Sequence, residues 1–230
     1  MQMPAELKTK TDKLPGNKIS GSNSIAYSYN SAVKAYFLKT VKPCEMMCLY
    51  GGIGLDLQWL TTSNFYVLFC EPSERMREIA RANVEQLQLR QQVSLVDGKK
   101  TDFHIWSQIN PPCDEVDAVL ANDTILNNIK DINLLFEKLA LIMNDGAHFI
   151  ATVLNYSFFS LFKFERSIAF KSLFNTEPLE VNVKSSTIHQ PLFIYSDNHL
   201  RKAYSNYFKL IMDKPIPNSG VRLIHLQKFT

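Results

Sequence analysis

One stretch, residues 44–82, constrains the fold of this chain more than any other (CEMMCLYGGIGLDLQWLTTSNFYVLFCEPSERMREIARA). An apolar run over Met46–Tyr50 leads into a glycine cluster, and a helix-like segment over Leu55–Leu60 follows. A second apolar run over Phe65–Cys70 then ends at Glu71. This order of strand, glycine turn, helix, strand and acid is typical of a nucleotide-binding βαβ unit.

The glycines Gly51, Gly52 and Gly54 would let the backbone turn tightly and come close to a ligand. Glu71 follows about 20 residues later, where a carboxylate can accept hydrogen bonds from ribose hydroxyls. An ordinary βα turn, whose glycines only relieve strain, is the alternative. The acid at the end of the second strand favours the ligand site.

The bulk composition is that of one globular domain without a membrane span. The chain has 230 residues, 46% of them hydrophobic, and a net charge of +3 that permits an anionic partner without requiring one. It has no signal peptide and no apolar run near the roughly 18 residues of a membrane span, so we expect an intracellular, cytoplasmic protein. We predict a flexible arm over residues 1–23 and one domain over residues 24–230.

The four cysteines and five histidines do not suggest a metal site. The cysteines lack a CxxC pair and lie mostly in predicted strands, which indicates buried, reduced thiols. No histidine lies near any of them in the sequence, and no histidine has an obvious acidic partner. We therefore predict no metal.

Strands and helices are expected to alternate through the first two thirds of the chain. This pattern predicts a parallel sheet covered by helices on both faces. Gly146 would serve as the exit of the last of these helices. Beyond the stretch 44–82, the predicted elements are helices over 24–40, 73–88, 102–108 and 132–143 and strands over 93–96, 116–121 and 147–153.

The last third changes character. Residues 156–170 are rich in Phe and would form a helix or a lid, with either RNA stacking or core packing as the role of these aromatics. The final two strands flank a Pro-rich loop and would form an antiparallel pair. The predicted elements here are strands over 179–184, 192–195, 207–212 and 221–229 and a helix over 198–206.

From about residue 24 to residue 230 the motif order resembles the class I S-adenosylmethionine-dependent methyltransferases. The resemblance implies an α/β, Rossmann-like fold: a mostly parallel seven-stranded sheet with an antiparallel C-terminal hairpin and helices on both faces. In that family the first strand ends in an acid followed by GxGxG. The matching residues here are Cys48 and then Tyr50-Gly51-Gly52-Ile53-Gly54, so the acid and the first glycine are replaced.

The resemblance implies S-adenosyl-L-methionine as cofactor and S-adenosyl-L-homocysteine as product. Glu71 matches the ribose-binding acid, and Asp97 matches the residue that contacts the adenine amino group, although Asp97-Gly98 is also a common turn pair. The predicted cofactor-binding residues are Lys34, Tyr50, Gly51, Gly52, Gly54, Asp56, Glu71, Pro72, Asp97, Gly98 and Asn122.

A shorter segment is similar to mRNA cap guanine-N7 methyltransferases, particularly divergent viral ones. It comprises Gly54-Leu55-Asp56-Leu57-Gln58-Trp59, with Asn30 and Lys34 on the preceding helix. The resemblance implies a viral-type, RNA-binding protein with capped RNA as substrate and other domains of a larger capping enzyme as partners. The family's His-Tyr pair is absent, because the sequence at that position is Asn122-Asp123-Thr124-Ile125-Leu126.

Three functions remain open at this point. The first is methyl transfer to the cap guanine N7, which has no proton to remove and so needs in-line approach rather than a general base. The second is methylation of a small molecule, and the third is a catalytically inactive, methyltransferase-like binding subunit. No catalytic residue is assigned, and the acceptor-side candidates are Asn122, Asp123, His189 and Tyr195.

Overall fold

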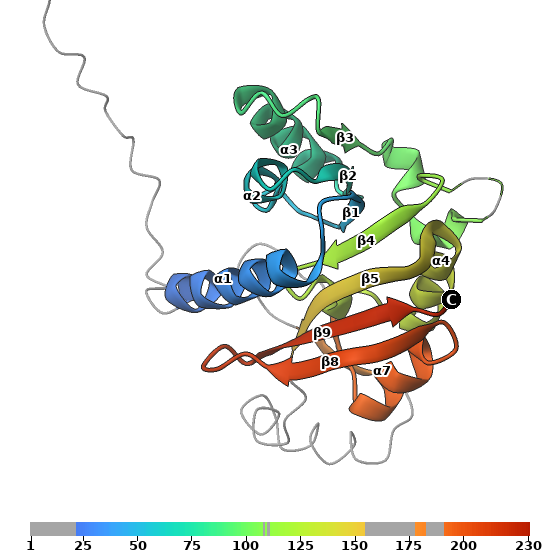
Figure 1. Ribbon diagram of the computed structural model, residues 1–230. Helices are drawn as coiled ribbons and strands as arrows, with labels where there is room; N and C mark the ends of the chain where they lie inside the picture. Colours follow the sequence, from blue (N-terminus) through green and yellow to red (C-terminus); the bar gives the residue numbers. More distant parts are fainter. Residues whose placement is uncertain (1–21, 108, 110, 155–177, 183–190) are drawn as a thin grey trace, which may run out of the picture.

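A seven-stranded sheet forms the centre of the computed structural model, which describes residues 22–107, 109, 111–154, 178–182 and 191–230. The strands of this sheet are β1 (Glu45–Leu49), β2 (Tyr66–Cys70), β3 (Val93–Leu95), β4 (Val116–Ala121), β5 (Met143–Leu154), β8 (Phe208–Pro215) and β9 (Val221–Lys228). Their order is β3-β2-β1-β4-β5-β9-β8 (Figure 1). The first five are parallel, and β9 runs antiparallel to both β5 and β8. The predicted fold class, including the closing hairpin, is confirmed.

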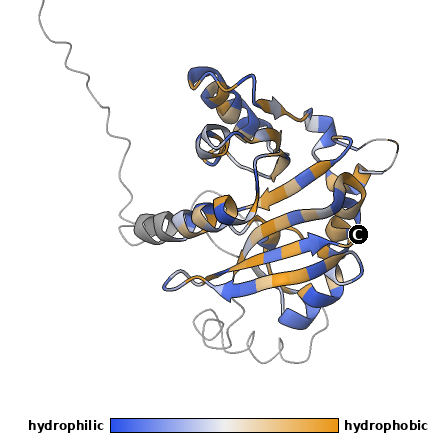
Figure 2. Ribbon diagram, in the orientation of Figure 1, coloured by the Kyte–Doolittle hydropathy of each residue, from blue (hydrophilic) through white to orange (hydrophobic). Residues whose placement is uncertain are grey.

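The central strands are apolar because both of their faces are covered. Four of the five residues of β1 are buried, and β4 has a single exposed position, Asp117, in six. A strand that alternated between apolar and polar residues would leave one face for water, whereas these strands do not. Figure 2 shows the apolar colouring along the middle of the sheet.

Three helices cover one face of the sheet: α1 (Ser22–Thr40), α2 (Leu57–Thr62) and α3 (Glu74–Gln86). Val33 and Phe37 of α1 are fully buried in this layer. The ring centroid of Phe37 lies 5.7 Å from that of Trp59 and 5.4 Å from that of Phe65. These aromatic contacts, edge-on to Trp59 and tilted to Phe65, attach α1 to the unit that carries the glycine turn.

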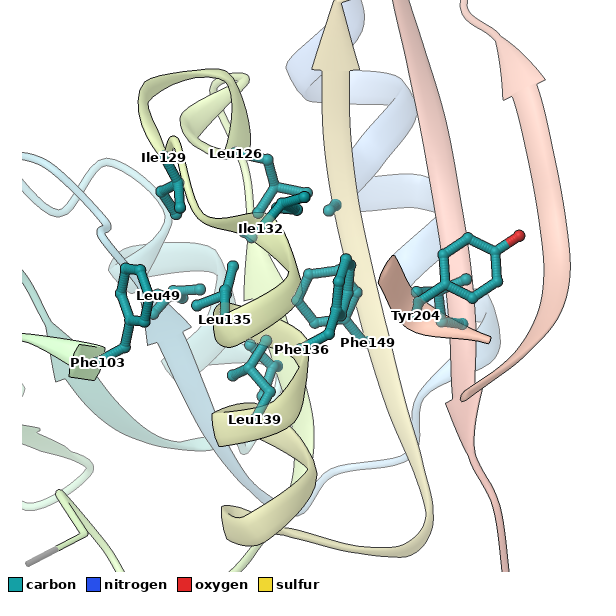
Figure 3. Packing of buried hydrophobic residues seen from close by; sticks show 14 of the residues in the cluster. Leu49, Phe103, Leu126, Ile129, Ile132, Leu135, Phe136, Leu139, Phe149 and Tyr204 are labelled. Carbon is teal, nitrogen blue, oxygen red and sulfur yellow. The ribbon is translucent and has the colours of Figure 1, made fainter. Parts of the chain in front are cut away.

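The opposite face is covered by α4 (Ile132–Ile142) and α7 (Asp197–Tyr204). Phe136 of α4 lies at the centre of this layer (Figure 3). Its ring centroid is 5.4 Å from Phe149 of β5, 6.0 Å from Tyr204 of α7 and 5.8 Å from Phe208 of β8. One aromatic side chain therefore joins two helices and two strands.

A second, two-stranded sheet pairs β6 (Leu179–Asn182) with antiparallel β7 (Pro191–Ile194). Both strands were predicted, and they pair with each other instead of extending the main sheet. The short helix η3 (Ile125–Asn128) ties them to the loop after β4, because the Asn127 side-chain amide donates to the Phe193 carbonyl at 2.7 Å.

Two local predictions are wrong. The helix expected over 102–108 is replaced by short 3₁₀ turns, η1 (Gly98–Lys100) and η2 (Phe103–Ile105). The carboxylates of Asp97 and Asp102 accept hydrogen bonds from the backbone two residues on, and such local bonds compete with a longer helix. Gly146 does not end a helix, because β5 already begins at Met143. Gly146 lies inside β5 with φ +78°, where the register against β4 shifts.

Helix α1 begins two residues earlier than predicted. The rest of the predicted arm, residues 1–21, and the Phe-rich segment 156–170 lie outside the described residues. In the part of the chain that is described, no helix is both long enough and apolar enough to cross a membrane.

Candidate functional site

The carboxyl ends of β1, β2, β3 and β4 meet at one edge of the sheet, because these four strands are parallel neighbours. The glycine turn follows β1, Glu71 follows β2, Asp97 lies just after β3, and Asn122 follows β4. Residues that are up to 72 positions apart in the chain therefore share one edge. This edge of an open α/β sheet is where ligands bind in such folds.

Two glycines of the turn differ in their surroundings: Gly51 is tightly packed, and Gly52 is open. A side chain at Gly51 would place its Cβ 2.4 Å from the Phe69 ring and 2.7 Å from the Cys48 sulfur. Gly52 has φ +60° and no atom within 4 Å of where a Cβ would stand. Gly51 therefore lets the strands pack, whereas Gly52 leaves backbone open to a ligand.

Glu71 is buried, at 4% exposure, and is held by the turn itself. Its Oε2 accepts the Gly52 N–H at 2.9 Å, and its Oε1 accepts the Ser73 N–H at 2.8 Å. Burial raises the pKa of this carboxyl, whereas the two N–H donors and the Arg77 guanidinium act in the opposite direction. Because each carboxylate oxygen has two lone pairs, one acceptor position remains on each.

The two departures from the family motif have clear structural consequences. Burial raises the pKa of the Cys48 thiol well above its usual value, so a neutral group stands where the family has an acid. Tyr50 replaces a glycine and keeps the left-handed backbone at φ 52°, while its N–H donates to the Cys70 carbonyl at 2.6 Å. Its half-buried ring packs against the core on the α4 side.

Asp97 is exposed, and its Oδ1 accepts the Lys99 N–H at 2.9 Å. The side chain therefore caps its own turn, and its other oxygen takes no part in that bond. Pro72 is exposed beside Glu71, and Gly98 lies against Arg77. Of these predicted cofactor-binding residues, Pro72 and Asp97 are therefore open to solvent.

A second group of polar side chains links α1 to the sheet edge. The Asn122 amide donates to Asp56 Oδ2 at 3.1 Å and to Asn30 Oδ1 at 3.3 Å. Asp56 Oδ1 accepts the indole N–H of Trp59 at 2.7 Å, and Lys34 Nζ lies 6.0 Å from the Trp59 ring centroid. Burial raises the pKa of Asp56. We call these five residues the α1 cluster.

Of the acceptor-side candidates, Asn122 belongs to the α1 cluster and Asp123 follows it directly in the chain. Asp123 is exposed and accepts the Tyr29 hydroxyl at 3.1 Å. Asp123 and Thr124 both have φ 55°, and two consecutive left-handed residues without glycine are strained. The Thr124 N–H is satisfied by the Thr152 hydroxyl at 2.9 Å.

The structure does not bring Tyr195 to this place. Tyr195 is buried, and its hydroxyl lies against the backbone carbonyls of Leu126 and Ile129, so it supports the loop after β4. We therefore remove Tyr195 from the acceptor-side candidates. His189 lies outside the described residues.

Several contacts of the site have no signal in the sequence. Tyr29 meets Asp123 across 94 positions, and Arg77 reaches the carbonyls of Glu71 and Pro72 from the next turn of helix. The histidines that had no partner in sequence also meet: His148 Nδ1 lies 2.9 Å from His225 Nε2. Among the described residues, no group of three or more His, Cys, Asp or Glu side chains could hold a metal ion.

No protein-family model and no curated protein matches this chain. Solved structures do match it. Magnesium protoporphyrin IX methyltransferase from Synechocystis, with bound S-adenosylhomocysteine, has 13% identity and a TM-score of 0.65, and the match covers 94% of this chain and 90% of that one. A glycopeptide N-methyltransferase with bound S-adenosylhomocysteine has 13% identity and a TM-score of 0.62, over 86% and 89% of the two chains.

A third structure is 1,6-didemethyltoxoflavin-N1-methyltransferase from Burkholderia thailandensis, with bound 1,6-didemethyltoxoflavin and S-adenosylhomocysteine. It has 11% identity and a TM-score of 0.61, over 92% of this chain and 80% of that one. At these identities the likeness establishes the fold. It is the Rossmann-like fold of S-adenosylmethionine-dependent methyltransferases.

Proposed function

We propose that the chain is an S-adenosylmethionine-dependent methyltransferase whose cofactor site is the carboxyl edge of β1, β2, β3 and β4. Glu71 is the observation that carries this proposal. It is buried, already bonded to the open Gly52, and retains one acceptor position on each oxygen. Two acceptor positions on one carboxylate suit two neighbouring hydroxyls, which is the pattern of a ribose.

The residues present fit the remaining parts of the cofactor. Gly52 offers open backbone beside the carboxylate, and Asp97 offers an exposed oxygen that can accept from an adenine amino group. Asp56 offers a carboxylate on the β1–β4 side, where the ammonium of an amino acid would find an acceptor. The Asn122 amide, whose two N–H groups bond Asp56 and Asn30, holds that carboxylate in place. When bound, S-adenosylmethionine supplies an electrophilic methyl group on a sulfonium.

For the acceptor we propose RNA, with the N7 atom of a cap guanine as the methylated position. The support is the meeting of Asn30, Lys34, Asp56 and Trp59, the residues of the cap-methyltransferase resemblance, in one cluster with Asn122. Guanine N7 attacks with a lone pair, so the site needs only to align the acceptor with the methyl group and needs no general base. Capped RNA would be the substrate, and other domains of a capping enzyme would be partners.

Two alternatives have support of their own. The matched structures include enzymes named for a porphyrin and a toxoflavin precursor, which favours a small-molecule acceptor. The neutral Cys48 thiol and the ring of Tyr50 replace motif residues at the turn, which favours a binding subunit without catalytic activity. The two experiments below separate these alternatives.

The first experiment is calorimetric titration of S-adenosylhomocysteine into wild-type protein, Glu71→Ala and Glu78→Ala. Glu78 is an exposed carboxylate on α3, the helix that follows Glu71, and is the matched control. Hydrogen bonds to a charged group contribute about 1.5–3 kcal/mol, so Glu71→Ala should weaken binding by roughly tenfold or more. Wild-type binding that is unaffected by Glu71→Ala would contradict the proposed site, and folded wild-type protein that does not bind would favour the inactive subunit.

The second experiment measures binding and methylation of capped RNA, uncapped RNA and a panel of small amines and hydroxyl compounds. An RNA substrate should bind more weakly as salt rises, because phosphate contacts release counterions. Methylation of the capped RNA alone supports the cap guanine. Methylation of a small compound together with salt-independent binding would contradict the RNA proposal.

A further inference from the structure

Helix α3 carries three arginines, and one of them is turned toward the site. Arg75 and Arg81 are exposed, whereas Arg77 is partly buried. Its Nη1 donates to the Glu71 carbonyl at 2.8 Å and to the Pro72 carbonyl at 2.9 Å. The guanidinium therefore holds the two residues that follow β2, one of which is the proposed ribose-binding acid.

The same guanidinium lies against the loop that follows β3. A Cβ atom built on Gly98 would stand 2.4 Å from Arg77 Nη2 and 2.8 Å from Arg77 Cζ. Gly98 is not among the residues with positive φ, so its backbone does not itself require glycine. A side chain at this position would therefore displace the Arg77 guanidinium.

Among the described residues, backbone hydrogen bonds join β2 and β3 only as far as the ends of these strands. Arg77 contacts the two loops beyond that point. The Val96 N–H donates to the Phe69 carbonyl at 2.9 Å, and no later backbone hydrogen bond joins these two loops in the described part of the chain. Beyond that bond, Glu71 and Asp97 belong to separate loops. Their spacing decides whether one ligand can reach both carboxylates.

We propose that Arg77 is a positioning residue, which holds the loops after β2 and β3 at the spacing that the adenosine half of the cofactor requires. This inference rests on the proposed function. Arg77 acts through Glu71, Pro72 and Gly98 and does not itself have to touch the ligand. A planar guanidinium suits this role, because its several N–H donors lie in a fixed geometry that lysine lacks.

Three variants test the proposal against a matched control. Arg77→Met removes the guanidinium and keeps most of the stem, and Arg77→Lys keeps the charge without the planar group. Gly98→Ala keeps the whole arginine but displaces its guanidinium, since the clashing atoms are the far end of a flexible side chain. Arg81→Met removes an exposed arginine from the same helix.

The readouts are the affinities for S-adenosylhomocysteine and adenosine by calorimetry, and the thermal midpoint of each unliganded protein. We expect Arg77→Met and Gly98→Ala to weaken both ligands by about fivefold to tenfold or more, Arg77→Lys to recover part of the loss, and Arg81→Met to bind like wild type. The unliganded midpoint of Gly98→Ala should stay close to that of wild type.

Two results would overturn the inference in distinguishable ways. If wild type binds S-adenosylhomocysteine and both Arg77→Met and Gly98→Ala bind it equally well, Arg77 does not position the loops, while the proposed function stands. If folded wild type binds neither ligand, the proposed function itself fails and the inference fails with it. A lower midpoint with unchanged affinity would show that Arg77 serves stability alone.

Discussion

Residues with positive φ lie at two of the strand ends that form the proposed site. Tyr50, Gly52 and Gly54 after β1 and Asp123 and Thr124 after β4 all have positive φ. Non-glycine residues in this region cost of order 1–3 kcal/mol each, and such strain often lies at ligand sites. Because β1 and β4 are adjacent parallel strands, the two strained turns lie next to each other at the proposed cofactor site.

Alanine substitutions at two glycines can distinguish a loss of folding stability from a loss of ligand binding. Gly52 and Gly220 have φ +60° and +70°, and at neither would a Cβ meet an atom within 4 Å. Gly52→Ala and Gly220→Ala should each lower the free energy of unfolding by about 1 kcal/mol, because alanine disfavours this backbone region. Only Gly52→Ala should weaken S-adenosylhomocysteine binding in calorimetry, since Gly220 lies in the turn between β8 and β9. Equal affinities in the two variants would mean that no ligand approaches Gly52.

Helix α1 is the element that completes the site. Val33 and Phe37 anchor it by burial, and on the same helix Tyr29, Asn30 and Lys34 reach the carboxyl edge of the sheet. The next turn of α1 is attached by a polar contact. Tyr36 donates to or accepts from His225 Nδ1 at 2.9 Å, and His225 in turn contacts His148 at 2.9 Å. This chain of polar groups joins α1 to β9 and β5.

The histidine chain should make stability depend on pH. Burial and the neighbouring His148 lower the pKa of His225 to about 4, and burial also lowers the pKa of His148. The unfolded chain, with a histidine pKa near 6.5, then binds more protons than the folded one between about pH 4 and 6.5. The free energy of unfolding should therefore fall as pH falls through this range, by at most about 1.4 kcal/mol per pH unit for each such histidine.

Urea unfolding at several pH values would check this dependence. His225→Gln should flatten it, whereas His104→Gln should leave it unchanged because His104 is exposed. Equal pH slopes for wild type and His225→Gln would show that the pair does not carry the dependence.

At the scale of the whole molecule, one sheet separates two apolar layers, and the site lies at its edge between them. The layer of α1, α2 and α3 and the layer of α4 and α7 both contribute residues to the cores beneath the site. A ligand in the proposed site would contact loops from four strands. Ligand binding should therefore raise the free energy of unfolding of the whole domain.

Ligand-linked stabilisation gives a direct test at this scale. S-adenosylhomocysteine at about 100 times its Kd should stabilise the protein by about 2.7 kcal/mol. For a domain of this size, that corresponds to a rise in thermal midpoint of roughly 5–10 °C. With its binding weakened about tenfold, Glu71→Ala should gain only about 1.4 kcal/mol at the same ligand concentration, which is about half of this rise. An equal rise in wild type and Glu71→Ala would place the ligand elsewhere.

How much of the fold could be predicted depended on how local its signal is. Continuous apolar runs predicted the buried parallel strands, and the runs on either side of the Pro-rich loop predicted the closing antiparallel pair. Alternating runs predicted β6 and β7 as strands, but their pairing with each other was not predicted. The prediction failed where two local signals competed: Asp97 and Asp102 capped short turns instead of a helix, and Gly146 formed a strand irregularity instead of a helix exit. Those choices depend on neighbours in space.

The sequence by itself determined the βαβ unit, the glycine turn, the acid after the second strand and the closing hairpin, because each follows from residue spacing within a short segment. Tertiary structure alone decided which side chains meet at the edge of the sheet. Asn122 reaches Asn30 across 92 positions, His225 reaches Tyr36 across 189, and Arg77 lies against Gly98. Hydrogen bonds and close packing act over a few ångströms, so contacts between distant segments exist only once the strands have been ordered side by side.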